Sequence, residues 1–265
     1  MALAPDRVLR TRPTARPLRA ALLAVLLTSA LLAQAQQLRS IAQHGAPVKY
    51  AAVGDAQPGL CREVAQQVQR FDPQLRIAGL ERDAPLRRVE LLLERGEIDV
   101  FFCLIETPER RRRFDFLSVP IYQVRHRVVQ RADDPAVLAH YDDLAAAGRR
   151  KPVLVAQGSV LAGRLVRAGV PVSEAAPSDI AALRMLLLGR SDAVYGQDMT
   201  LLPLLQLPEF AGRLRLGETV FDEERQLVAV DRRLPGATRL RLETALSALE
   251  RKGLLRELVE RYHQR

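Results

Sequence analysis

Residues 96–122, GEIDVFFCLIETPERRRRFDFLSVPIY, place a buried strand, a short helix and a second extended segment in immediate succession. The apolar run 98–103 has the length and composition of a strand that is buried on both faces of a sheet. Thr107 and Pro108 then supply an N-cap and a proline at the first helical position, which predicts a helix through Arg113. A buried strand followed directly by a helix is the repeating unit of α/β folds, so this stretch decides the fold class.

The same alternation of strands and helices continues on both sides of this stretch. Upstream, we expect a strand at 48–53, a helix with Leu60, Val64 and Val68 on its buried face, a strand at 75–80, and a helix from Pro85 to Gly96. Downstream, we expect extended crossings at 124–130 and 225–230, strands at 153–156 and 192–195, helices that begin at Ser159 and Ser178, and a helical tail at 237–262 broken at Gly253. The sequence therefore predicts two α/β lobes joined by two crossings.

The first 35 residues are predicted to be a signal peptide rather than part of the fold. Five arginines precede the uncharged apolar segment 20–32, and Ala33-Gln34-Ala35 supplies the small-x-small pattern of a cleavage site. Cleavage after Ala35 would start the mature chain at Gln36. The apolar segment is shorter than the roughly 20 residues of a membrane helix, although a retained anchor is the alternative. No twin-arginine pair precedes it, so we expect Sec export to the periplasm and no stable membrane anchor.

Composition excludes several classes of function. The chain has 265 residues and a formal net charge of +9, and removal of the leader, with its five arginines and Asp6, lowers this by four to +5. The basic residues are spread along the chain and there is no Trp, so nucleic-acid binding is not expected. Cys61 and Cys103, the two cysteines, are predicted to pair in an oxidising compartment, with two free thiols as the alternative. The four histidines show no metal-ligand spacing, so neither a metal nor another cofactor is expected.

Several motifs make the mature chain similar to the family 3 extracellular solute-binding proteins. Gly96-Glu97-Ile98-Asp99, Thr107-Pro108-Glu109-Arg110 and the series from Phe116 to Tyr122 resemble the family's G-x-x-D, T-x-x-R and F-S-x-P-Y motifs, in order and at similar spacing. The resemblance implies a type II periplasmic binding protein fold with a ligand cleft between two lobes. The implied boundaries are 36–126 for the first lobe, 127–226 for the second, and 227–265 for the C-terminal part of the first.

Arg110 is the main candidate for ligand binding. A guanidinium offers a planar fork of donors that matches a carboxylate, and the resemblance assigns Arg110 the role of holding the carboxylate of the ligand. The alternative is a surface salt bridge with Glu109 or Asp115. As a ligand residue, Arg110 should be replaceable by Ala without a change in the melting temperature of the ligand-free protein. Thr107 is first a helix cap and second a possible ligand contact.

Further candidates are drawn from both lobes. Gly158 and Ser159 open a helix whose N-terminus favours an anion, and Ser159 matches a ligand position of the family. The remaining candidates are Arg88, which resembles a second cleft arginine of part of the family, together with Tyr122, Asp55, Gln197 and Asp198. Two departures bear on the ligand. The loop 54–59 lacks the aromatic residue that stacks on amino acids in the family, and the acid that binds an α-ammonium group falls at Gln197, with Asp198 one residue late.

These features predict a monomeric binding protein that delivers a carboxylate-bearing solute to the permease of an ABC importer, and no catalysis. One alternative is a sensor whose ligand-bound form is recognised by a membrane receptor. A second alternative is an enzyme that resembles the exported cyclohexadienyl dehydratases, with Glu106 or Asp198 as the catalytic acid.

Overall fold

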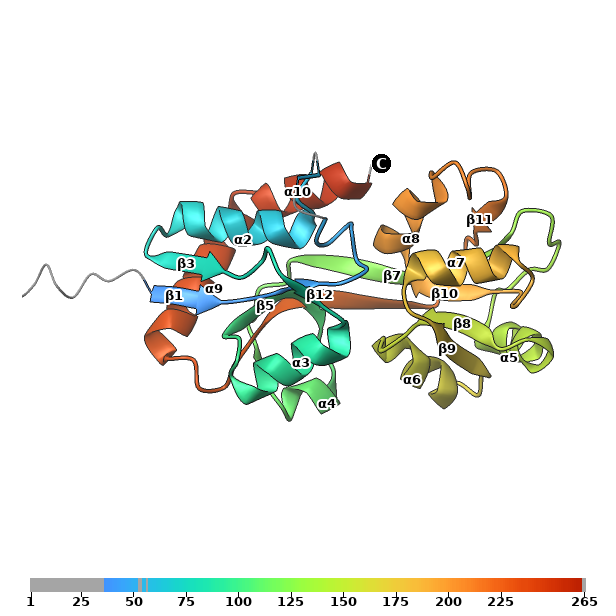
Figure 1. The fold of residues 1–265 in the computed structure, drawn as a ribbon, viewed down its shortest axis with the longest axis horizontal. Helices are drawn as coiled ribbons and strands as arrows, with labels where there is room; N and C mark the ends of the chain where they lie inside the picture. The colour runs from blue at the N-terminus through green and yellow to red at the C-terminus, as the bar shows by residue number, and fades with distance from the viewer. Residues whose placement is uncertain (1–35, 52–53, 56, 264–265) are drawn as a thin grey trace, which may run out of the picture. The chain divides into compact units, whose positions relative to one another are not determined.

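A computed structural model describes residues 36–51, 54–55 and 57–263. The predicted signal peptide, 1–35, lies outside the described residues. Residues Gln37–Arg265 form one compact unit. This unit is a mixed α/β structure of two lobes, connected by the long strands β7 (Tyr122–Arg131) and β12 (Asp222–Val230) (Figure 1).

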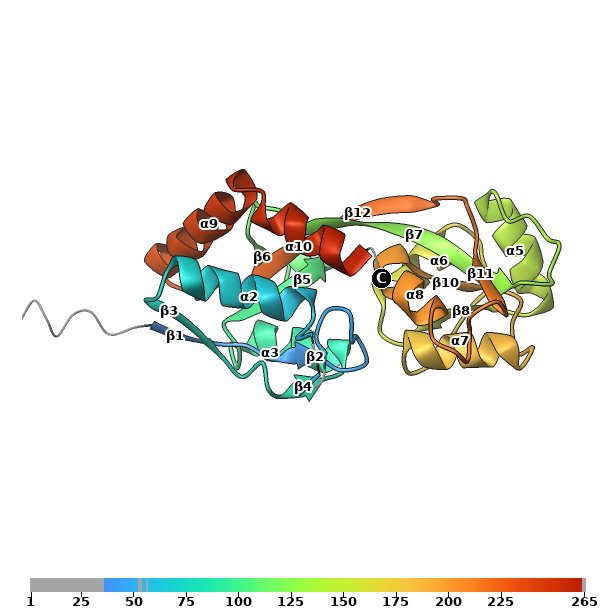
Figure 2. The same ribbon diagram turned by 90° about the horizontal axis from the view of Figure 1, so that it is seen from above.

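The first lobe is built from both ends of the described chain. Its elements are β1 (Gln36–Arg39), β2 (Ala42–Gln43), α2 (Leu60–Phe71), β3 (Leu75–Ala78), β4 (Asp83–Ala84), α3 (Leu86–Arg95), β5 (Val100–Ile105), α4 (Pro108–Arg111), β6 (Asp115–Phe116), α9 (Gly236–Arg251) and α10 (Leu254–His263). Figure 2 shows α2 beside α9 and α10. The tail therefore returns to the first lobe, and Gly253 separates its two helices.

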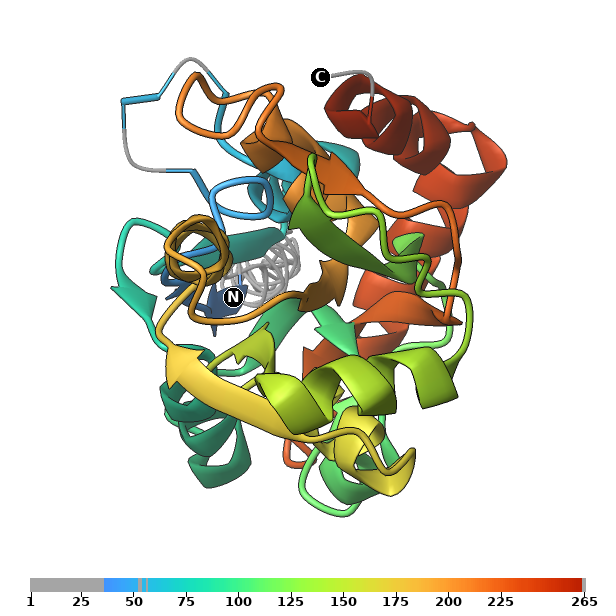
Figure 3. The same ribbon diagram turned by 90° about the vertical axis from the view of Figure 1, so that its right-hand side faces the viewer.

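The second lobe is a sheet covered by helices on both faces. Its elements are α5 (Tyr141–Arg150), β8 (Val153–Ala156), α6 (Val160–Arg167), β9 (Val172–Ala176), α7 (Asp179–Leu187), β10 (Val194–Gln197), α8 (Asp198–Leu205) and β11 (Leu214–Leu216). Adjacent strand residues belong to different apolar clusters: Val194 packs with α7 and α8, whereas Tyr195 packs with α5 and α6. This alternation is expected of a strand with two buried faces, and Figures 1 and 3 show helices on both sides of these strands.

One sheet runs through both lobes, in the order β5-β12-β7-β10-β8-β9. The two crossing strands pair with each other in antiparallel fashion, from Asp222 opposite His126 to Gln226 opposite Tyr122. Beyond Gln226, β12 pairs with β5 in the first lobe, so the return crossing begins at Asp222, a few residues before the expected position. The predicted fold class, two α/β lobes joined by two crossings, is confirmed.

The predicted strand at 48–53 is wrong where the structure describes it. Residues 46–50 form a turn instead, in which the N–H groups of Lys49 and Tyr50 both donate to the carbonyl oxygen of Ala46. The carbonyl oxygens of Val48 and Lys49 accept hydrogen bonds from the first N–H groups of α2, which satisfies donors that the helix itself leaves free. Val48, Tyr50 and Ala51, the apolar residues that suggested a strand, are buried in this turn and directly after it.

Glycine is required where this turn meets α2. Gly59 has a φ of 92°, and a Cβ atom at this position would lie 2.5 Å from the carbonyl oxygen of Lys49. Only a residue without a side chain permits such a close approach. Gly59 therefore fixes the position of Lys49 against the helix.

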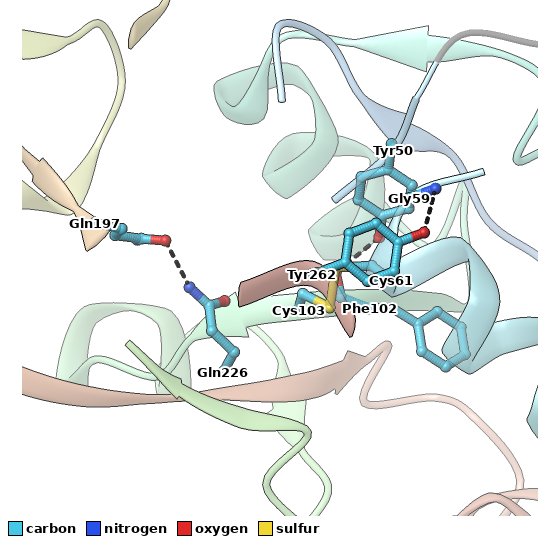
Figure 4. The surroundings of a disulfide bond; sticks show 8 residues. All are labelled: Tyr50, Gly59, Cys61, Phe102, Cys103, Gln197, Gln226 and Tyr262. Carbon is cyan, nitrogen blue, oxygen red and sulfur yellow. Dashed lines mark hydrogen bonds between the residues drawn. A yellow bond between two sulfur atoms is a disulfide. The ribbon is translucent and has the colours of Figure 1, made fainter. Parts of the chain in front are cut away.

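Strand β5 carries an irregularity at its C-terminal end. Leu227 lies opposite Leu104 and Ala229 opposite Phe101, so Phe102 and Cys103 together face a single residue of β12. Cys103 has a φ of 62°, a left-handed conformation that is uncommon outside glycine. It forms the expected disulfide with Cys61 in α2 (Figure 4). Bulges of this kind redirect a strand beside a functional site, and Cys103 lies in the wall of the cavity described next.

Candidate functional site

A cavity of about 340 Å³ lies where the two lobes face each other. The lobes approach closely at two places on its rim. A Cβ atom on Gly45 would lie 3.4 Å from the Cβ of Ser178, and one on Gly158 would lie 3.4 Å from the Cγ of Arg87. Ligand cavities of proteins typically begin at about 300 Å³, so this volume fits a small solute.

Arg110 lines the cavity but is held from behind by its own lobe. It is buried, its Nε and Nη2 donate to Oε1 of Glu90 at 3.1 and 2.7 Å, and its Nη1 donates to the carbonyl oxygen of Ile105 at 2.7 Å. The pairing expected as the alternative, with Glu109 or Asp115, is not present: these acids pair with Arg112 and with Arg232 and Arg239. Of the five N–H groups of a guanidinium, one on each terminal nitrogen is left for a ligand.

Lys49 is a second cation in the cavity wall, and sequence reasoning missed it. The residue is 8% exposed, and no hydrogen bond or ion pair within the described part of the chain engages its ammonium group. The pKa of Lys49 is lowered to about 8, chiefly by burial; Asp179 opposes this shift and Arg110 adds to it. The ammonium group is therefore mostly protonated at neutral pH and free to bind an anion.

The second lobe contributes the N-termini of two helices. Ser159 caps α6 by accepting a hydrogen bond from the N–H of Leu161 at 3.2 Å, and Gly158 before it has a φ of 75°. Ser178 caps α7, and Asp179 is the first residue of that helix. Burial raises the pKa of Asp179 to about 6 and outweighs the attraction of Lys49. Gly158, Ser159 and Asp179 all line the cavity.

Two glutamines close the cavity next to the crossing strands. Nε2 of Gln226 in β12 donates to Oε1 of Gln197 in β10 at 3.1 Å (Figure 4). Gln226 is fully buried, and its own Oε1 has no hydrogen-bond partner among the described residues. The family resemblance placed an acid for an α-ammonium group at Gln197, and the structure has a pair of amides there. The pair leaves one buried acceptor without a partner among the described residues, the Oε1 of Gln226.

Five other candidates do not line this cavity. Thr107 caps α4 by accepting from the N–H of Arg110 at 3.2 Å, and Asp198 accepts from the N–H groups of Arg125 and Met199. Arg88 is exposed on α3, whereas its neighbour Arg87 reaches the cavity wall. Asp55 is exposed, and Tyr122 is buried with a hydroxyl that has no hydrogen-bond partner among the described residues.

Within the described part of the chain, no group of three or more metal-ligating side chains could hold a metal ion. No described helix is long and apolar enough to cross a membrane.

Comparison with known proteins shows the fold. No protein-family model matches the chain, and no curated protein matches it. Among solved structures, the chain is similar to a histidine kinase sensor domain with similarity to periplasmic binding proteins (17% identity, 86% of this chain and 96% of that chain, TM-score 0.74). It is also similar to a mutant of ArgBP from T. maritima (19% identity, 86% and 96%, TM-score 0.73) and to the substrate binding protein of an amino acid ABC transporter (17% identity, 87% and 100%, TM-score 0.71). The chain therefore has the two-lobed fold of periplasmic binding proteins.

Proposed function

We propose that the protein is an exported, monomeric solute-binding protein that captures a small carboxylate-bearing solute in this cavity and delivers it to the permease of an ABC importer. The observation that carries the proposal is the pair of buried cations, Arg110 and Lys49, in a cavity of about 340 Å³ between two lobes. A buried cation without a balancing anion is unfavourable, so Lys49 gains when an anionic solute enters, whereas Arg110 keeps Glu90 and offers the solute its two remaining N–H groups.

Further support comes from the second lobe and from the fold. The N-terminus of α6 adds positive potential to the cavity wall opposite Arg110. One protein of the same fold is the substrate binding protein of an amino acid ABC transporter.

We propose lobe boundaries of 36–126, 127–226 and 227–265, and periplasmic localisation after cleavage of residues 1–35. The apolar clusters support this division, because they separate near residues 124–128 and 221–228, with Met199 of α8 as the exception that packs with the first-lobe cluster.

Sensing is the second candidate function, because one of the similar structures is a histidine kinase sensor domain. Uptake of a labelled solute in a strain that lacks the gene would separate the two. Lost uptake supports import, whereas normal uptake with a lost transcriptional response to the solute supports sensing.

We infer no catalytic role for the two acids that the enzyme alternative requires. Glu106 pairs with Arg111, and neither it nor Asp198 lines the cavity. Asp198 is occupied by backbone N–H groups.

The proposed function is tested by calorimetry of the purified protein against carboxylates and amino acids. We expect saturable binding of at least one carboxylate. Arg110→Lys keeps the charge beside Glu90 but loses the planar fork, so the affinity should fall by about tenfold or more. Arg112→Lys, on an exposed side chain, is the matched control and should change the affinity by less than about threefold. Equal affinities in both variants would remove Arg110 from the site.

A further inference from the structure

The charges in the cavity wall define the solute more narrowly than the proposed function does. Among the described residues of the wall, Lys49, Arg87 and Arg110 are basic, Asp179 is the one acid, and His44 is paired with Asp83. The wall thus holds more cations than acids, and the amide of Gln197 occupies the position at which the family resemblance led us to expect an acid.

Glu90 is shared between two arginines, with Oε1 on Arg110 and Oε2 on Arg113 at 2.6 Å, and Arg113 also pairs with Glu94 at 3.0 Å, so these four side chains carry no net charge. Lys49 and Arg87 add two positive charges to the wall, and Asp179 removes one. Arg110 still offers one N–H on each terminal nitrogen, and no described residue forms a hydrogen bond or ion pair with the ammonium group of Lys49. The wall therefore presents two separate groups that can each hold a carboxylate.

Lys49 is placed to act on a different part of the solute from Arg110. Lys49 lies in the turn at the N-terminus of α2, whereas Arg110 follows β5 and is fixed by Glu90 and Ile105. Asp179 approaches Lys49 from the second lobe without an ion pair between them. The ammonium group of Lys49 thus keeps its N–H groups available to a ligand. Among the described residues, no hydrogen bond or ion pair offsets the cost of burying its charge.

We propose that the cavity binds a dicarboxylate, with one carboxylate on Arg110 and the other on Lys49. This inference rests on the proposed function and narrows its ligand class. The buried Oε1 of Gln226 adds an acceptor, which favours a dicarboxylate that carries a hydroxyl or another neutral donor. An ammonium group is disfavoured, because it would share the cavity with two buried cations.

The test compares each dicarboxylate with its own monoamide, which has nearly the same shape and one charge fewer. The protein is expressed from the full sequence and purified in the form that the cell produces. It is then titrated at neutral pH with malonate, succinate, glutarate and the monoamide of each. At least one dicarboxylate should bind about tenfold more tightly than its monoamide, as expected for one desolvated charge pair. In Lys49→Met this preference should fall to less than about threefold, while the affinity for the monoamide stays within about threefold of wild type. Lys151→Met, a half-exposed lysine paired with Asp192, is the control and should keep the preference.

The comparison in wild-type protein decides the question even if Lys49→Met does not fold. Equal binding of dicarboxylates and monoamides, or an unchanged preference in Lys49→Met, would overturn the dicarboxylate inference and leave the proposed function intact. Absence of binding by every carboxylate would overturn both. Aspartate provides a further check, since it should bind more weakly than succinate. Tighter binding of aspartate that is lost in Asp179→Asn would instead identify an ammonium site at Asp179.

Discussion

Replacing Arg110 by Ala should destabilise the protein even without ligand. The side chain is 4% exposed, it makes charge-assisted bonds to Glu90, and it also satisfies the carbonyl oxygen of Ile105. Breaking a buried ion pair by removing one partner costs roughly 3 to 5 kcal/mol, because the other charge is left buried. Glu90 keeps Arg113 as a partner and is itself 12% exposed, so we expect a smaller loss in the free energy of unfolding, about 2 to 3 kcal/mol. This differs from the sequence-based expectation of an unchanged melting temperature.

The loss is measured by urea denaturation of the ligand-free protein. For a chain of this size it corresponds to a melting temperature lowered by roughly 4 to 12 °C. Arg112→Ala is the control, since that side chain is 71% exposed and lies 3.8 Å from Glu109, and it should cost less than about 0.5 kcal/mol. A double-mutant cycle with Glu90→Ala should give a coupling free energy of about 1 to 3 kcal/mol. An Arg110→Ala variant as stable as wild type, with no coupling to Glu90, would show that this buried pair is absent in solution.

Three further predictions concern other parts of the chain. Mass spectrometry without reductant should find Cys61 linked to Cys103, and the double Ala variant should lose up to about 4 kcal/mol of stability; two alkylated thiols in exported protein would contradict this. The mature protein should begin at Gln36, and an intact mass that includes Ala35 or residues before it would refute cleavage there. Burial lowers the pKa of His126 to about 4 from its ordinary 6.5, so this residue should reduce stability by on the order of 3 kcal/mol as pH falls from 6.5 to 4.

The His126 effect is isolated by comparison with His126→Gln. Asp179, whose pKa is raised, changes stability in the opposite direction over part of the same pH range, because its neutral form suits the folded state better. The difference between wild type and variant removes this contribution. A variant with the same pH dependence as wild type would show that His126 is not buried in its neutral form.

Local sequence signals predicted most of the fold because they reflect local physics. Thr107 and Ser178 cap their helices, and Gly96 ends α3 in a left-handed conformation. These features depend on residues within one turn of the chain. The strand at 48–53 failed because its signal, apolar residues in a short run, also describes a buried turn. The contacts that decide between the two are with α2, whose position is set by tertiary packing.

The candidate site was predicted in part for the same reason. The motif that identified Arg110 is local, and the structure does bring Arg110, Gly158, Ser159 and Gln197 to one cavity. Arg88 was one position away from Arg87, a difference of about 100° around a helix, which periodicity alone does not resolve. Glu90 was overlooked because its role depends on a contact with Arg110, 20 residues away on another helix, which no local pattern indicates.

The ligand class depends on two residues that carry different kinds of information. Gln197 could be seen in the sequence as the loss of an acid, and a lost acid by itself is equally compatible with a monocarboxylate and with a larger neutral solute. Lys49 could not be seen, because it was assigned to a strand, where its side chain would have had no defined relation to Arg110. Only the turn fixed by Gly59 places its free ammonium group in the cavity wall. With an amide at Gln197, Asp179 is the one acid among the described residues of the wall, and Lys49 supplies a site for a second carboxylate, so the two residues favour the same dicarboxylate ligand.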